Sequence, residues 1–275
     1  MSILTSAFSR RELFIWVVGI LAATQLFRVN ALQLGDPFGD ALWRSLASRS
    51  AFQYLAWYVV FRLLADSAPS PLSRADLAVG FVASLSSLVM FGAMAWLVAT
   101  AVGAYLWAAS GGDSNLRSAS VVLLALAFNA LWAPQLFEVI SLPLLWADTA
   151  LVWAALSLLQ TGFTWRGTII ESPGHAIAIF GPCSSFHNIS LGLLCWIALT
   201  KLARPEWVRG DFYVGLAVVA AVLCINTLRV YLMALNPAMY AYWHEGTGAE
   251  VFGWSMALAV LAISLAGVLR TTVRQ

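Results

Sequence analysis

The feature that most constrains this sequence is a series of apolar stretches, most of them long enough to cross a lipid bilayer. Of the 275 residues, 61% are hydrophobic and only 10% are charged, and the mean hydropathy is +0.83. A soluble domain carries about 25% charged residues, whereas a membrane-spanning helix needs about 20 apolar ones. The sequence therefore predicts an all-α, polytopic integral membrane protein.

Eight transmembrane helices are predicted within a single integral membrane domain, residues 1–275. Five spans fall in residues 1–161, and three fall in a catalytic half, residues 162–275. Residues 76–109 form either one extended, tilted helix or two short re-entrant pieces, and we take them as one. A tight turn at 133–135 is expected between the fourth and fifth spans. The predicted spans cover residues 13–32, 52–64, 76–109, 118–132, 137–159, 185–202, 212–235 and 251–269.

Basic residues in short loops mark the cytoplasmic side of a membrane protein. With eight spans, most of them fall on one side: Arg10, Arg11, Arg74, Lys201, Arg204, Arg209, Arg270 and Arg274. The exceptions on the other side are Arg44, Arg49, Arg117 and Arg166. This bias predicts a multi-pass protein of the inner (cytoplasmic) membrane, with the loops at 162–184 and 236–250 together on the extracytoplasmic face.

The first of these outer loops contains a candidate β-hairpin before the sixth span. Residues 168–171 and 175–180 read as two strands, and Ser172-Pro173-Gly174 supplies turn chemistry between them. Such a hairpin would lie on the membrane surface and deliver Cys183 to the sixth helix. A plain loop that contains isoleucines remains the alternative.

Cys183 stands at the predicted start of the sixth span, followed by the helix-capping residues Ser184 and Ser185. A helix N-terminus carries positive potential, which favours the nucleophilic thiolate. The alternative is a small, inert residue at the end of a span. The other cysteines, Cys195 and Cys224, form no CxxC pair, and an odd number gives no disulfide framework. No metal-ligand spacing is present in the sequence, so neither a metal nor a cofactor is predicted.

Polar residues inside the predicted spans are the next candidates. Arg229 in the seventh span shares a helical face with Asn226. An arginine within a membrane costs about 2.5–3.5 kcal/mol and marks a functional site by default, although one that reaches the lipid phosphates is the alternative. Asp148 in the fifth span is expected to pair with Arg229, Arg28 or Arg62.

His244 follows the seventh span on the same predicted face as Cys183 and Arg229. A thiolate, an oxyanion stabiliser and a proton carrier are the groups that acyl transfer requires. His187 is a second candidate for the proton carrier, because four residues separate it from Cys183 and a helix starting at the cysteine would place both on one face.

These residues resemble a known family. Cys183-Ser184, then Asn226-Thr227-Leu228-Arg229, then His244 is similar to the pattern of the exosortase/archaeosortase family, membrane cysteine transpeptidases that process C-terminal sorting signals of the PEP-CTERM type. The resemblance covers roughly residues 168–269. Ser185 stands where the family usually has glycine, which indicates a divergent branch.

The resemblance implies Cys183 as nucleophile, Arg229 as oxyanion stabiliser and His244 as proton carrier, supported by Ser184, Ser185, Asn226 and His187. Its implied partner is an exported protein with a C-terminal sorting signal: a short motif, an apolar span and a basic tail. Cleavage would pass through a thioester, without a cofactor and without nucleic acid. The alternative function is a small transporter or channel that uses Arg229 and Asp148 and tolerates loss of Cys183.

Overall fold

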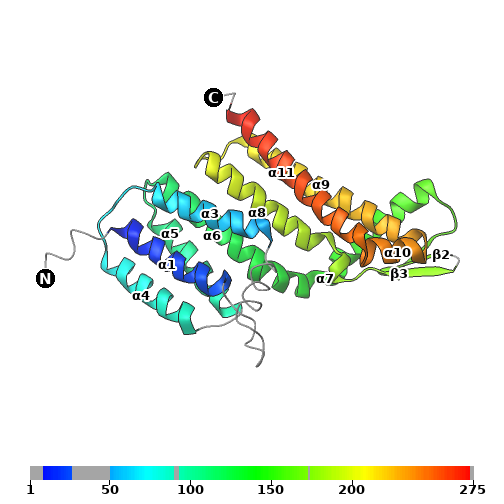
Figure 1. Ribbon diagram of the computed structural model, residues 1–275, viewed down its shortest axis with the longest axis horizontal. Helices are drawn as coiled ribbons and strands as arrows, with labels where there is room; N and C mark the ends of the chain where they lie inside the picture. The colour runs from blue at the N-terminus through cyan, green and yellow to red at the C-terminus, as the bar shows by residue number, and fades with distance from the viewer. Residues whose placement is uncertain (1–8, 27–49, 90–92, 173, 273–275) are drawn as a thin grey trace. The chain divides into compact units, whose positions relative to one another are not determined.

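Helices make up most of the computed structural model, which describes residues 9–26, 50–89, 93–172 and 174–272 (Figure 1). Within these residues, four helical segments are long and apolar enough to cross a membrane: 114–159, 185–203, 209–235 and 247–270. Two shorter apolar helices are 51–65 and 93–109. The prediction of a polytopic, mainly helical membrane protein is confirmed, whereas the count of eight spans stays a prediction.

Several predicted features lie outside the described residues. They are the end of the first span at 27–32, the turn residue Pro173, and the arginines Arg28, Arg44, Arg49 and Arg274. The described chain clusters into two compact units, residues 1–131 with 197–207, and residues 132–196 with 208–275. Every candidate site residue belongs to the second unit, and the single-domain organisation stays a prediction.

The first unit corrects the prediction of one long helix over residues 76–109. Two helices occupy this stretch, α4 (Arg74–Val89) and α5 (Ala93–Ala109), and they pack against each other. A contact between the two helices shows that they are not one straight helix: Asp76 Oδ1 accepts a hydrogen bond from the Tyr105 hydroxyl at 2.8 Å and lies 2.9 Å from Arg10 Nε. In one straight helix, Asp76 and Tyr105 would lie roughly 43 Å apart. The helices of this unit are α1 (Arg10–Leu26), α3 (Ala51–Ala65), α4 (Arg74–Val89), α5 (Ala93–Ala109) and α6 (Ser114–Ala127).

The predicted tight turn at 133–135 is also wrong. After α6, residues Phe128–Trp132 form a π-helical segment that leads directly into α7 (Ala133–Leu159). Pro134 is the second residue of α7, directly after the π-helical segment. The bend comes later in α7, at Ile140 (φ −116°, ψ 22°), just before Pro143.

The second unit combines long helices with a small antiparallel sheet of strand order β1-β2-β3. Strands β2 and β3 form at the residues predicted as a hairpin, and β1 was not predicted; the placement of the sheet outside the membrane stays a prediction. Ile170 and Ile177 are cross-strand partners, and both are buried where the sheet packs against α9. The remaining elements are β1 (Thr164–Arg166), β2 (Ile169–Ser172), β3 (His175–Ala178), α8 (Ser185–Ala203), α9 (Arg209–Leu235), α10 (Pro237–His244) and α11 (Thr247–Thr272).

Candidate active site

Cys183 ends a single 3-10 turn, Gly181–Cys183, that joins β3 to α8. Its N–H donates to the carbonyl oxygen of Phe180 at 2.9 Å, and the Ser184 N–H donates to Gly181 at 3.1 Å. Ser184 has an extended backbone (φ −70°, ψ 142°) and caps α8, because its hydroxyl oxygen accepts the Phe186 N–H at 3.3 Å. The cysteine therefore lies two residues before the helix rather than within its first turn.

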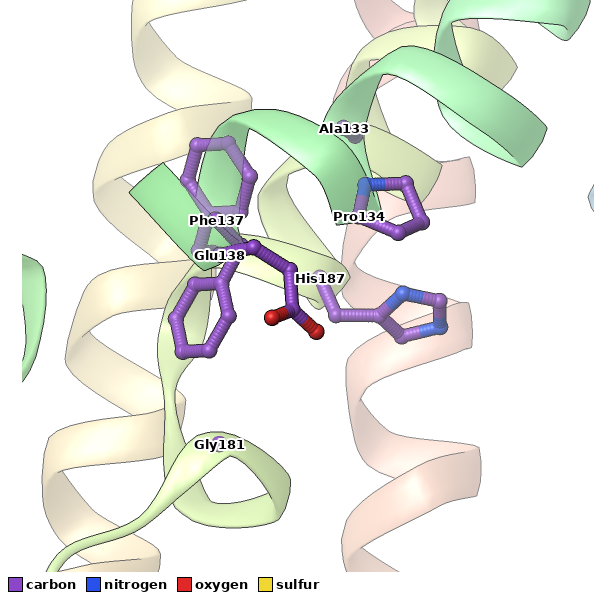
Figure 2. A pocket seen from close by; sticks show the side chains of 7 residues that line it. Ala133, Pro134, Phe137, Glu138, Gly181 and His187 are labelled. Atoms are coloured by element: carbon purple, nitrogen blue, oxygen red, sulfur yellow. The ribbon is translucent and has the colours of Figure 1, made fainter. Parts of the chain in front are cut away.

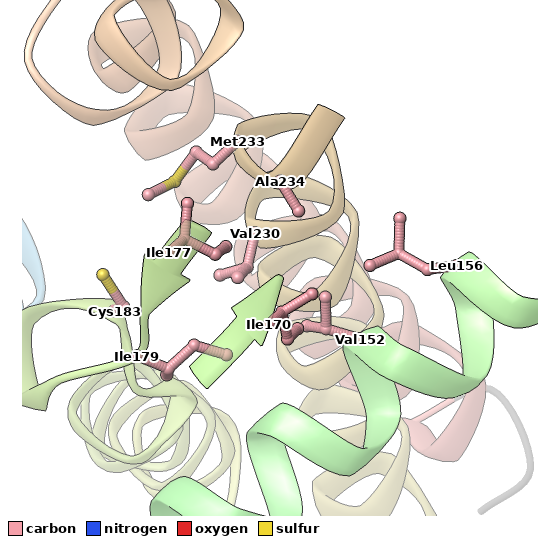
Figure 3. Packing of buried hydrophobic residues seen from close by; sticks show 9 residues of the cluster. All are labelled: Val152, Leu156, Ile170, Ile177, Ile179, Cys183, Val230, Met233 and Ala234. Carbon is pink, nitrogen blue, oxygen red and sulfur yellow. The ribbon is translucent and has the colours of Figure 1, made fainter. Parts of the chain in front are cut away.

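The Cys183 side chain is only 5% exposed and belongs to an apolar cluster (Figure 3). The other buried members are Val152, Leu156, Ile170, Ile177, Ile179, Val230, Met233 and Ala234. By contrast, the neighbouring Phe180 is 62% exposed. The thiol is thus shielded from bulk water, while the chain that leads to it is accessible.

Asp148 of α7 anchors the start of α8. Its carboxylate accepts hydrogen bonds from the Ser184 hydroxyl (2.8 Å), the Ser185 N–H (3.0 Å) and the Ser185 hydroxyl (2.6 Å). All three residues are buried. The expected pairing of Asp148 with Arg229 or Arg62 is therefore wrong, because donors at a helix N-terminus satisfy a buried carboxylate as an arginine would. This arrangement fixes the two residues that follow Cys183.

Helix α9 brings Asn226 and Arg229 to the same cysteine. The Asn226 Nδ2 donates to the carbonyl oxygen of Cys183 at 2.9 Å, and Asn226 is 2% exposed. Arg229 lies close enough for its charge to interact with the Cys183 thiol. The spacing of Asn226 and Arg229 predicts that they share one helical face, and in the structure both lie toward Cys183.

Arg229 is half-buried and held within the protein. Its Nε donates to the carbonyl oxygen of Trp243 at 3.1 Å, and its guanidinium carbon lies 4.6 Å from the centre of the Phe252 ring. These contacts orient the guanidinium and argue against a side chain that only reaches for lipid phosphates. Within the described chain, its two Nη groups have no hydrogen-bond acceptor, so they are free to bind a developing oxyanion.

His244 is the last residue of α10 and is 27% exposed through its side chain. Its ring stacks on Tyr240 with centroids 4.8 Å apart, and its Nδ1 lies 3.4 Å from Glu245 Oε1. The preceding residue, Trp243, packs against the cluster that contains Cys183. The structure therefore places the residue before His244 against the cluster of Cys183, and among the described contacts no hydrogen bond joins the His244 and Cys183 side chains.

His187 lies on a different surface. It is exposed and lines a cavity of about 220 Å³ together with Ala133, Pro134, Phe137, Glu138, Gly181 and Phe186 (Figure 2). Because α8 begins at Ser185, Cys183 and His187 do not share a helical face as the spacing suggested. Among the described contacts, no hydrogen bond joins the His187 ring to the Cys183 thiol.

His175 is a residue that sequence reasoning missed. It lies on β3, its Nε2 is 3.1 Å from the carbonyl oxygen of Met233, and its ring meets Tyr240 edge-on with centroids 6.0 Å apart. The Tyr240 ring therefore contacts the rings of both His175 and His244. The available signal was its position in the strand that leads to Cys183.

The Arg229 guanidinium lies near the Cys183 thiol, and acyl transfer requires, besides a nucleophile and an oxyanion stabiliser, a proton carrier, for which His244 stays a prediction. The described residues contain no group of three or more His, Cys, Asp or Glu side chains that could hold a metal ion.

Comparison with known proteins adds a family match. The family model for the transmembrane exosortase matches residues 44–261, more than half of the chain and including Cys183, Asn226, Arg229 and His244. No curated protein and no solved structure matches the chain.

Proposed function

Because this chain belongs to the transmembrane exosortase family, we propose that it is a membrane-embedded cysteine peptidase and transpeptidase. The family acts on exported proteins that carry sorting signals. Its substrate here is an exported protein whose C-terminus has a short motif, an apolar span and a basic tail. The enzyme resides in the inner membrane as a multi-pass protein, with Cys183 on the extracytoplasmic side.

The observation that carries this proposal is that two side chains of α9 contact or approach Cys183. Asn226 holds the carbonyl of the cysteine, and Arg229 reaches the thiol region with its Nη groups free of described partners. An inert cysteine at the end of a span needs neither contact. A nucleophile needs a fixed backbone and a nearby cation to stabilise negative charge.

In the first step, the Cys183 thiolate attacks the scissile carbonyl carbon, and Arg229 stabilises the resulting oxyanion. His244 donates a proton to the leaving amine as the peptide C–N bond breaks, which leaves a thioester on Cys183. In the second step, His244 takes a proton from the acceptor, water or an amine, which attacks the thioester and releases the thiolate. His244 must approach Cys183 during this cycle, since catalytic hydrogen bonds often tighten only with substrate present.

The test uses cells that produce the wild-type protein, Cys183→Ala or Cys195→Ala. Mass spectrometry of envelope proteins should find the C-terminal span and tail removed in the wild type and retained in Cys183→Ala. Cys195 is equally buried and lies on α8, so Cys195→Ala is the matched control and should process normally. Added hydroxylamine should appear as a hydroxamate at the new C-terminus if a thioester forms. Equal processing in Cys183→Ala and the wild type would exclude the proposal.

The transporter alternative receives less support. It requires Arg229 and Asp148 to line a common path, but the Asp148 carboxylate is buried and bound by Ser184 and Ser185. The transporter alternative also predicts that the protein tolerates the loss of Cys183, and the comparison of Cys183→Ala with the wild type tests this.

A further inference from the structure

The sheet in the second unit has a free edge whose backbone groups point outward. The Ile179 N–H donates to the Thr168 carbonyl oxygen at 2.8 Å, one residue beyond the Ile169–Ala178 pair of the β2–β3 ladder. In an antiparallel ladder, every second residue exchanges hydrogen bonds with the partner strand. Counting back from Ile179, Ile177 faces β2, whereas Ala176 and Ala178 direct their N–H and C=O groups away from it.

Within the described residues, no hydrogen bond is recorded for these outward groups of Ala176 and Ala178. Exposed sheet edges in native proteins are usually kept very short or are blunted by proline, lysine, a bulge or a covering segment, because they otherwise pair with other chains. Strand β3 reads His-Ala-Ile-Ala and carries neither proline nor lysine. This edge is short, with four residues, but neither proline nor lysine blocks its outward backbone groups, so it can receive a short partner strand.

The same strand leads to the nucleophile. After Ala178, only Ile179, Phe180 and the turn Gly181–Cys183 separate β3 from the thiol. A polypeptide extended along the free edge therefore runs toward the segment that ends at Cys183. Phe180, 62% exposed, offers an apolar surface along that path.

We propose that the substrate polypeptide binds as a fourth strand along the free edge of β3 and is led by it to Cys183. This inference rests on the proposed function and specifies how its substrate is held. The residues before the scissile bond approach Cys183 in the N-to-C direction, as β3 does, so the added strand runs parallel to β3. Backbone pairing supplies affinity, and alternate side chains of the substrate supply specificity.

The test on the substrate side is a proline scan. A reporter carries the C-terminal segment of a processed protein found by the mass-spectrometric experiment above, and each residue before the cleavage site is changed to proline in turn. Proline removes one N–H, and only every second substrate residue points its N–H toward β3. Processing should fall at least about tenfold at alternate positions and much less at those between.

The test on the enzyme side compares two edge prolines. Ala178→Pro removes an outward N–H from the β3 edge, and Trp165→Pro removes one from the β1 edge, which does not lead to Cys183. Both N–H groups point away from the ladder, so proline is compatible with either strand. Ala178→Pro should lose at least about tenfold in processing rate, whereas Trp165→Pro should retain it.

The outcomes separate this inference from the proposed function. If processing depends on Cys183 but the scan shows no alternation and Ala178→Pro is active, the edge pairing is wrong and the proposed function stands. If Cys183→Ala processes like the wild type, the proposed function fails and this inference fails with it. If Ala178→Pro only converts a dimer to a monomer in detergent, a second copy of the chain occupies the edge, which also overturns the inference. If Ala178→Pro fails to accumulate, the substrate scan decides alone.

Discussion

Replacing Asp148 by asparagine should release the turn that holds Cys183 without unfolding the helices around it. The carboxylate of Asp148 is the acceptor for three donors from Ser184 and Ser185, directly after the cysteine. Asparagine keeps the shape of the side chain but retains only one acceptor oxygen and turns an amide N–H₂ toward the remaining donors. The perturbation therefore acts at the start of α8.

The size of the effect follows from these contacts. Hydrogen bonds to a charged group contribute about 1.5–3 kcal/mol each, and asparagine preserves about one of the three. Relief of the desolvation cost of a buried charge offsets part of the loss. We expect the free energy of local opening around Cys183 to fall by roughly 2 kcal/mol, which corresponds to roughly a 30-fold faster reaction of the thiol with a small reagent.

The assay measures the rate at which methyl methanethiosulfonate modifies each cysteine of the purified protein, read out by peptide mass spectrometry. Cys224 is exposed and is replaced by serine, which leaves the buried Cys183 and Cys195. Cys195 is 0% exposed and lies farther along α8, so it reports on global loosening. Glu138→Gln is the matched variant, because it neutralises an exposed carboxylate on the same helix, α7, that has no described hydrogen bond.

Asp148→Asn should accelerate modification of Cys183 and leave Cys195 unchanged, while Glu138→Gln changes neither rate. An unchanged Cys183 rate in Asp148→Asn would refute the anchoring role of this carboxylate. Equal acceleration of Cys183 and Cys195 would show that Asp148 stabilises the whole unit rather than the turn before α8.

Three further predictions concern the reaction and the topology. Arg229→Lys keeps the charge but loses the planar guanidinium. Both Arg229→Lys and Arg229→Ala should reduce the processing rate about 10²–10³-fold while the protein level in the membrane stays normal. A variant that fails to accumulate would indicate a structural role instead. His244→Ala should abolish turnover in a processing assay and His187→Ala should only weaken it, and the reverse result would reassign the proton carrier. In a cysteine-free background, an impermeant thiol reagent applied to intact cells should label Thr247→Cys and not Glu206→Cys, both at exposed positions; the opposite pattern would place Cys183 on the cytoplasmic side.

The ends of the last three long helices were predictable because polar residues mark them. Predicted spans 185–202, 212–235 and 251–269 correspond to α8, α9 and α11 to within a few residues. The uniform apolar run over 76–109 contains no such mark, so hydropathy could not separate α4 from α5. The contact between Asp76 and Tyr105 joins the two helices, and it depends on tertiary structure that hydropathy does not report.

Helix α10 shows a local signal that sequence reasoning passed over. Asn236 caps this helix, with its side chain accepting the Met239 N–H at 2.9 Å, and Pro237 occupies the first helical position. Asn-Pro before an aromatic stretch is a recognisable helix start. The 236–250 segment, treated as a loop in sequence analysis, thus holds His244 on a short helix.

The position of Asp148 changes the electrostatic argument for Cys183 itself. The sequence predicts that the positive N-terminus of the sixth helix favours the thiolate. In the structure, however, the first donor there, the Ser185 N–H, is bound by Asp148, and the Phe186 N–H is bound by Ser184. A carboxylate at the end of a helix offsets the potential that an anion would otherwise feel. The α8 terminus therefore positions Cys183, and the cation whose charge interacts with the thiol is Arg229. On this reasoning Arg229 acts before the oxyanion forms as well as after it, so its loss should slow reaction of Cys183 with any thiol reagent as well as with substrate.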